Sequence, residues 1–261
     1  MIKCDFHTHT SYCDVKSTVE EMVLSAIDKG MESLGISGHC YTPFDSFPYY
    51  MSKENTKKYL EDVKECKEKY KDKIRILCGT EYDSYCPYPE GDYDYMVGSA
   101  HYAKSGDDYI AVDLSKDTLL ASVDSHFGGD IYAFAEEYYR SVRLLLNKKI
   151  DIIGHLDLVT KYNEGNCLLD TNNPRYVKAV TDTIDALLPM KVPFEINTGA
   201  ISRGYRKSPY PTVEILSYIK EKGGKVIFSS DAHHKDNLCY QFDIWYPFFK
   251  GKGCLPEVVT L

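Results

Sequence analysis

The residues Asp5-Phe6-His7-Thr8-His9 end an apolar run at the start of the chain, and Ser230-Asp231-Ala232-His233 end another near its finish. Alternate residues of an extended segment point to the same side. The two His of the first segment can therefore share one metal ion, and the Asp and His of the second segment can do the same. Both ends of the sequence thus predict metal ligands.

Four more polar residues occupy the same kind of position, directly after or at the end of an apolar, β-prone run that finishes in small residues. They are His39, Glu81, His101 and His155. A single His at the end of a strand more often has a structural role than a ligating one, and eight His in 261 residues is ordinary usage. Four such strand ends, together with the paired ligands of both terminal segments, favour a metal cluster.

The hydrophobic pattern predicts strands that alternate with helices. Seven strands are expected, at 2–7, 33–38, 74–80, 94–99, 151–155, 192–197 and 225–230, and helices at about 18–29, 52–71, 131–148, 174–188 and 212–222. Ser17 and Glu20 have the spacing of a capping box that opens the first helix. The stretch 104–129 has no clear periodicity, and we expect a long loop there, at the mouth of the site.

Alternating strands and helices imply a parallel sheet, and seven units favour a closed α/β barrel. In such barrels, ligands and catalytic groups gather at the carboxyl ends of the strands. Each candidate ligand named so far falls at that edge, so the predicted topology and the predicted metal site agree.

The composition limits the possible partners. A formal net charge of −8 argues against a general nucleic-acid surface, which needs clustered Lys and Arg, but bound cations would still permit a small phosphorylated substrate. No apolar run approaches the length of a membrane span, and no signal peptide is evident. The nine Cys form no CxxC pair, which suits a reducing cytoplasm. We therefore expect a cytoplasmic protein that does not contact a membrane.

Two internal stretches make a family resemblance specific. They are Asp151-Ile152-Ile153-Gly154-His155-Leu156-Asp157-Leu158-Val159 and Phe194-Glu195-Ile196-Asn197-Thr198. Together with the terminal segments, they make the chain resemble the PHP family, named for polymerase and histidinol phosphatase, and its histidinol-phosphatase branch in particular. The resemblance covers essentially the full length. It implies one domain, residues 1–261, folded as a distorted (β/α)7 TIM-like barrel.

The resemblance also implies a set of metal ligands for two or three divalent transition-metal ions, Zn, Mn or Fe. One ion would be held by His7, His9, Glu81 and Asp231. A second would share Glu81 and add His101 and His155. A third would be held by Asp14, His39 and His233, with Asp14 on a loop where a solvated carboxylate is the ordinary alternative. Imidazole and carboxylate suit these metals, and a carboxylate can bridge two ions.

The activity implied is that of a metal-dependent phosphomonoesterase, with L-histidinol phosphate as the leading substrate. Glu81, Asp231 and His233 would be the catalytic residues, and Asp231 or a neighbouring His would protonate the leaving alcohol. Arg203, Arg206 and Lys161 are candidate phosphate contacts, although each could instead be a solvated surface cation.

Other readings of the same ligands remain open. Phosphotyrosine proteins, nucleotides or oligonucleotides are alternative substrates within the family. An amidohydrolase is disfavoured because no Lys is placed to bridge two metals, and a binding domain with a degenerate site is disfavoured by the complete ligand set. The sequence leaves open the native metal, the oligomeric state, and the roles of His126 and His234.

Overall fold

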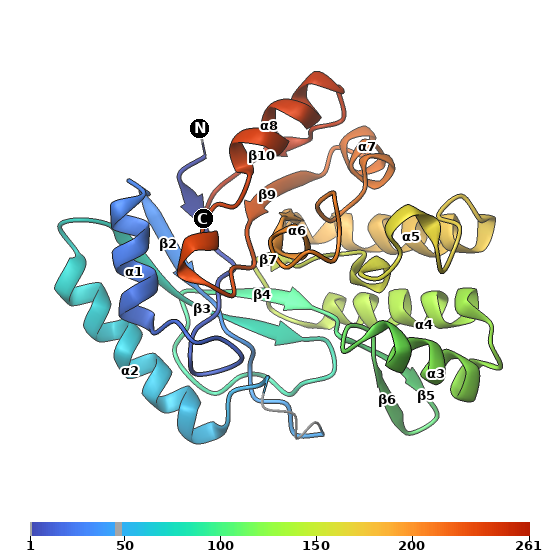
Figure 1. The fold of residues 1–261 in the computed structure, drawn as a ribbon, viewed down its shortest axis with the longest axis horizontal. Coiled ribbons are helices and arrows are strands. Elements are labelled where there is room, and N and C mark those ends of the chain that lie inside the picture. The colour runs from blue at the N-terminus through green and yellow to red at the C-terminus, as the bar shows by residue number, and fades with distance from the viewer. Residues whose placement is uncertain (1, 45–48) are drawn as a thin grey trace.

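The computed structural model describes residues 2–44 and 49–261, and its centre is a curled, all-parallel sheet (Figure 1). In spatial order, its strands are β1 (Cys4–Asp5), β2 (Ser33–Ile36), β3 (Arg75–Asp83), β4 (Tyr95–Ser99), β7 (Ile152–Ile153), β8 (Phe194–Asn197), β9 (Lys225–Ser229) and β10 (Glu257–Val258). The first seven are the strands predicted from the sequence.

The sheet curls until the segments that follow β1 and β9 meet. Thr8 and Ala232 form a parallel bridge, supported by hydrogen bonds from the Ala232 N–H to His7 O (3.2 Å) and from the His9 N–H to Ala232 O (3.0 Å). The predicted TIM-like barrel is therefore confirmed, with β10 as an unpredicted eighth strand beside β9. This bridge also brings the two terminal metal-ligand segments together.

Helices surround the outside of the sheet, with α1 and α2 on one side and α4 and α5 on the opposite side (Figure 1). The α-helices are α1 (Val19–Asp28), α2 (Lys53–Tyr70), α3 (Lys116–Phe127), α4 (Ile131–Arg143), α5 (Pro174–Leu187), α6 (Gly199–Ser202), α7 (Val213–Glu221) and α8 (Phe242–Gly251). Short 3-10 helices are η1 (Leu144–Asn147), η2 (Leu158–Thr160), η3 (Glu164–Asn166), η4 (Leu188–Met190) and η5 (Lys235–Asn237). Within the described ranges, no helix combines the length and apolar character that a membrane crossing requires.

Two sequence-based expectations need correction. The capping box of α1 lies one residue later than predicted, because Thr18 Oγ1 accepts the Glu21 N–H (3.2 Å) and the Glu21 carboxylate accepts the Thr18 N–H (2.9 Å). The stretch expected to be a long loop instead contains the antiparallel hairpin of β5 (Tyr102–Ser105) and β6 (Asp108–Ala111), followed by α3.

The inside of the barrel is filled below the site by buried apolar side chains. These are Phe6, Leu77, Tyr95, Val97, Ile152 and Ile227. The Tyr95 ring fits because β2 and β3 carry glycine beside it: a Cβ at Gly35 or Gly79 would lie 2.2 Å or 2.3 Å from its nearest atom. Its hydroxyl donates to Phe6 O (2.7 Å). This floor confines polar chemistry to the carboxyl edge of the sheet.

Candidate metal centre

Glu81, near the end of β3, lies at the middle of the polar cluster and is 1% exposed. One carboxylate oxygen, Oε1, is 2.9 Å from His155 Nε2 and 3.2 Å from His101 Nε2. The other, Oε2, is 2.8 Å from His39 Nδ1 and 3.3 Å from His7 Nε2. Since the two oxygens face imidazoles from different strands, this carboxylate has the geometry to bridge two ions.

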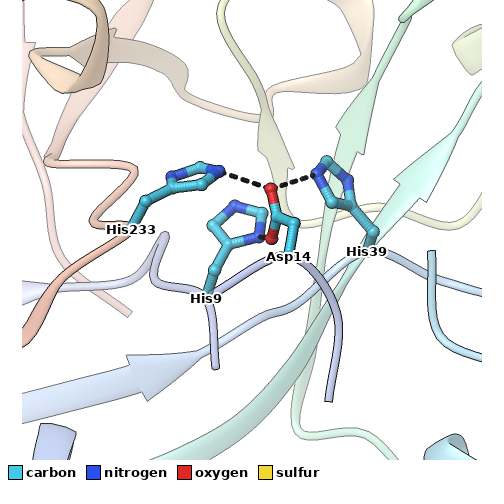
Figure 2. Close-up of side chains that lie close together, drawn as sticks. All are labelled: His9, Asp14, His39 and His233. Carbon is cyan, nitrogen blue, oxygen red and sulfur yellow. Dashed lines mark ion pairs between the residues drawn. The ribbon is translucent and has the colours of Figure 1, made fainter. Parts of the chain in front are cut away.

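Asp14 joins a second group of ligands, drawn in Figure 2. Its Oδ2 is 2.8 Å from His233 Nε2 and 3.7 Å from His39 Nε2, while its Oδ1 is 3.4 Å from His9 Nδ1. The three imidazoles come from the segments after β9, β2 and β1, and they converge on one carboxylate. The structure thus brings Asp14, predicted on a loop, into the cluster.

Asp231 completes the ring of predicted ligands. Its Oδ1 is 3.1 Å from His9 Nε2, 3.4 Å from His233 Nδ1 and 3.9 Å from His7 Nε2. The residue has φ +47°, a left-handed conformation that is uncommon outside glycine and typical of functional sites. Gly199 leaves room for the Asp231 side chain, because a Cβ there would lie 2.8 Å from Asp231 Cβ.

Two outer carboxylates, for which the sequence reading gave no role, orient the imidazoles. Glu195 Oε1 accepts from His7 Nδ1 (2.7 Å), and its Oε2 accepts the His155 backbone N–H (2.7 Å). Asp83 Oδ2 lies 3.1 Å from His101 Nδ1 and accepts the His101 N–H (2.9 Å). A carboxylate on Nδ1 fixes the tautomer that leaves Nε2 free for a metal. Period-2 spacing from Glu81 could have indicated Asp83.

The cluster passes a direct test of fit for metal ions. Buried atoms without any hydrogen-bond partner in the described chain include His7 Nε2, His9 Nε2, Asp14 Oδ1 and Glu81 Oε2. Buried polar atoms are normally satisfied, so unsatisfied ones facing each other need a partner that is not protein. Three groups of donors lie within 4.8 Å: His9–Asp14–His39–His233, His7–His9–Glu81 and His39–Glu81–His101. Nitrogen and carboxylate donors of this kind suit Zn, Mn or Fe.

The charges of the site favour added cations. Burial opposes protonation of His7, but the carboxylates of Glu195 and Glu81 hold its pKa well above the usual value. Burial likewise opposes ionisation of Asp231, but Arg203 and His7 hold its pKa well below the usual range. Burial and the Arg203 guanidinium lower the pKa of His233 to about 4, which keeps its imidazole in the neutral, metal-binding form.

A pocket of about 270 Å³ opens above the cluster, and its lining shows which of the predicted phosphate contacts can reach a bound substrate. Arg203 lines it and donates to Asp231 Oδ2 (3.0 Å). Lys161 also lines it. Arg206 does not: it lines a separate pocket, stacks on the Tyr210 ring at 4.6 Å and bonds Thr160. The structure therefore brings two of the three predicted cations to the site.

The two His left outside the predicted ligand set lie outside the cluster. His126, near the end of α3, is 3.8 Å from the exposed Asp108 carboxylate. His234 follows a ligand in sequence but points elsewhere, and its Nδ1 accepts the Asp236 N–H (3.3 Å) at the start of η5.

Comparisons with known proteins agree with this geometry. A model of the PHP domain family matches residues 5–199. A histidinol-phosphatase of Bacillus subtilis is 23% identical over 267 residues, covering 93% of this chain and 98% of that protein. A structure assigned as a histidinol phosphatase of Listeria monocytogenes superposes with a TM-score of 0.78 at 20% identity, covering 93% of this chain and 100% of that one.

A second solved structure shares the fold. It is the histidinol phosphate phosphatase of Lactococcus lactis, complexed with zinc, L-histidinol and phosphate, with a TM-score of 0.66 at 19% identity, covering 100% of this chain and 97% of that one. At these identities the two structures support the fold, and the family match supports the resemblance drawn from the sequence motifs.

Proposed function

The chain belongs to the PHP family, and we propose that it is a metal-dependent phosphomonoesterase that hydrolyses L-histidinol phosphate to L-histidinol and phosphate. The observation that carries the proposal is Glu81, buried between four imidazoles whose nitrogens face it at 2.8 to 3.3 Å. The relatives named for this activity match over 90 to 93% of this chain and 82 to 98% of their own length, which favours this substrate over nucleotides or phosphoproteins.

We assign the ligands as the sequence resemblance implies. His7, His9, Glu81 and Asp231 would hold one ion, Glu81, His101 and His155 a second, and Asp14, His39 and His233 a third. Divalent ions at these positions would neutralise phosphate charge and make water a better nucleophile. Two or three Zn, Mn or Fe ions are part of the proposal, and so is a cytoplasmic location, which the nine free thiols support.

The protein's own groups have separate tasks in the reaction. Glu195 and Asp83 keep the protons of His7 and His101 on Nδ1, which leaves each Nε2 as a ligand atom. Arg203 lies on the pocket wall, where its guanidinium can donate to a phosphate oxygen while it stays close to Asp231. Because the pKa of Asp231 is low, its carboxylate is ionised and needs to gain a proton before it can protonate a leaving alcohol.

The test is a substrate panel on protein loaded separately with Zn and Mn. The panel contains L-histidinol phosphate, a phosphotyrosine peptide, a mononucleotide and a phosphodiester. We expect kcat/KM to be highest for L-histidinol phosphate and expect Glu81→Gln to abolish it. Activity confined to the phosphodiester would contradict the proposal, as would a metal content of one equivalent or less after reloading.

A further inference from the structure

The pocket has a second wall that the metal ligands do not form. Tyrosines, leucines and one pair of opposite charges line it: Tyr49, Tyr50, Tyr102, Tyr205, Leu114, Leu158, Asp113 and Lys161. Four carboxylates line the pocket in the described part of the chain, and Asp14, Glu81 and Asp231 belong to the proposed metal centre. Asp113 is the fourth and lies in none of the metal-donor groups, so the metal chemistry leaves it unexplained.

Asp113 is held rigidly just after β6. Its backbone oxygen accepts from Lys161 Nζ (3.0 Å) and from the Tyr162 hydroxyl (2.7 Å), and its Oδ2 accepts from Lys161 Nζ (3.1 Å). Within residues 2–44 and 49–261, no protein donor bonds the other carboxylate oxygen, Oδ1. The Asp113 side chain is 28% exposed and that of Lys161 only 10%, so the pocket meets the carboxylate more than the ammonium.

The carboxylate is charged at neutral pH. Burial raises the pKa of Asp113, but the Lys161 ammonium and then His101 outweigh burial and lower it. Beside it, the Tyr205 ring already lies against one cation, Lys161 Nζ, at 4.8 Å from the ring centroid and is 42% exposed. Aromatic faces attract organic cations, and an ionised carboxylate gives the strongest hydrogen bonds to them. Asp113 Oδ1 and the exposed part of the Tyr205 ring are therefore the positions on this wall where a positive group can bind.

We propose that Asp113 binds an ammonium group carried by the alcohol part of the substrate. Phosphate would lie against the metal centre and Arg203, and the ammonium would bond Asp113 Oδ1 on the wall that carries Tyr205. The enzyme then selects a class of substrate, the short phosphomonoester that carries both an anionic and a cationic end. This inference rests on the proposed phosphatase function and adds what selects the leaving group.

The test compares L-histidinol phosphate with its analogue that lacks only the amino group, 3-(imidazol-4-yl)propyl phosphate. The measured quantity is the ratio of the two kcat/KM values. We expect wild-type protein to favour the amino substrate by about 10- to 100-fold, the range of a hydrogen bond to a charged group. In Asp113→Asn we expect the ratio to fall toward one. A wild-type ratio near one, or a ratio unchanged in Asp113→Asn, would overturn the subsite.

A second variant keeps the test decisive if Asp113→Asn does not fold. Lys161→Arg keeps a cation beside the carboxylate, which therefore stays ionised, so we expect the preference for the amino substrate to stay. If the ratio falls in this variant, Lys161 and not Asp113 controls selection, and the inference is wrong. If Lys161 instead contacts phosphate, both substrates slow equally and the ratio stays, because both carry phosphate.

Failure of the proposed function has a different signature. Wild-type protein that hydrolyses neither substrate, yet cleaves p-nitrophenyl phosphate, would refute histidinol phosphate as the substrate. The subsite is then tested by calorimetric titration of Zn-loaded protein with L-histidinol and with 3-(imidazol-4-yl)propanol. Tighter binding of L-histidinol that is lost in Asp113→Asn would support the ammonium subsite, and equal binding of the two alcohols would overturn it.

Discussion

Replacing Glu195 by glutamine tests whether the outer carboxylates build the metal centre. Glu195 is fully buried, and both of its oxygens accept N–H donors: His7 Nδ1 at 2.7 Å on one side, the His155 backbone at 2.7 Å and Asn197 Nδ2 at 3.0 Å on the other. An amide has the same shape but only one accepting atom. After the substitution, the NH₂ group of the amide therefore faces an N–H donor on one side of the residue.

Both orientations of the amide have a cost that can be worked out. If its oxygen stays on the His155 N–H, the NH₂ faces His7 Nδ1 and favours the tautomer with the proton on Nε2, the atom needed for metal. If the amide turns over, the His155 N–H is left unsatisfied, at about 1 to 3 kcal/mol of stability. Loss of an outer-shell partner of a metal-binding His typically lowers metal affinity about 10- to 100-fold, and we expect that range here.

The assay is a competition titration of Zn against a chelating indicator, together with urea unfolding of the metal-free protein. Glu221→Gln is the matched control, since Glu221 is exposed on α7 and does not line the pocket. Wild-type metal affinity and an unchanged free energy of unfolding in Glu195→Gln would refute the assigned role. A loss of the same size in the Glu221→Gln control would show that the effect is not specific to the site.

Four further substitutions probe other contacts of the site. Glu81→Gln should lower metal content and turnover together, as metal analysis and kinetics will show; full occupancy with near-normal turnover would contradict a bridging role. Arg203→Ala should lower kcat/KM by an amount that corresponds to about 1.5 to 3 kcal/mol of transition-state stabilisation. Arg206→Ala should lower kcat/KM clearly less, because Arg206 lines another pocket. Equal losses in the two variants would contradict the assignment of Arg203 alone to the substrate pocket. Gly199→Ala should reduce bound metal, because its Cβ would displace Asp231; unchanged metal content would show that Asp231 is not a required ligand.

The sequence predicted best those features that depend on local periodicity. Seven strands and the helices at α2, α5 and α7 appear within a few residues of their expected bounds, since apolar, β-prone runs and Ser52 as a helix cap are visible locally. The hairpin of β5 and β6 was missed because each strand has only four residues and the residues beside its turn, Ser105 and Asp108, are polar. Helix α3 was missed because only Leu119 and Val123 among its side chains are buried, too few to produce a helical apolar stripe.

The site was predictable where a residue follows a strand and less so where a loop decides. His39, His101 and His155 could be placed at the carboxyl edge because each follows its strand directly. Glu195 was overlooked because a buried Glu inside a strand looks like part of a motif and not like a partner of His7, which follows β1 at the far end of the sequence. The separation of Arg203 from Arg206 depends on the path of the loop after β8, which no periodic pattern encodes.

The unsatisfied atoms of the cluster carry an energetic cost that a purely structural core would not have. Glu81 Oε2, His7 Nε2 and His9 Nε2 lie within ion-pair distance of other site groups but make no hydrogen bond in the described chain. A buried polar atom without a hydrogen bond costs on the order of 1 to 3 kcal/mol. The sum over these atoms is a large share of the roughly 5 to 15 kcal/mol by which a domain is stable. A core of apolar side chains at this edge would avoid that cost. Metal ions that bind only the folded chain would recover it, because they supply the missing partners and shift the folding equilibrium by mass action. The same ions that perform the chemistry would therefore also stabilise the carboxyl end of the barrel.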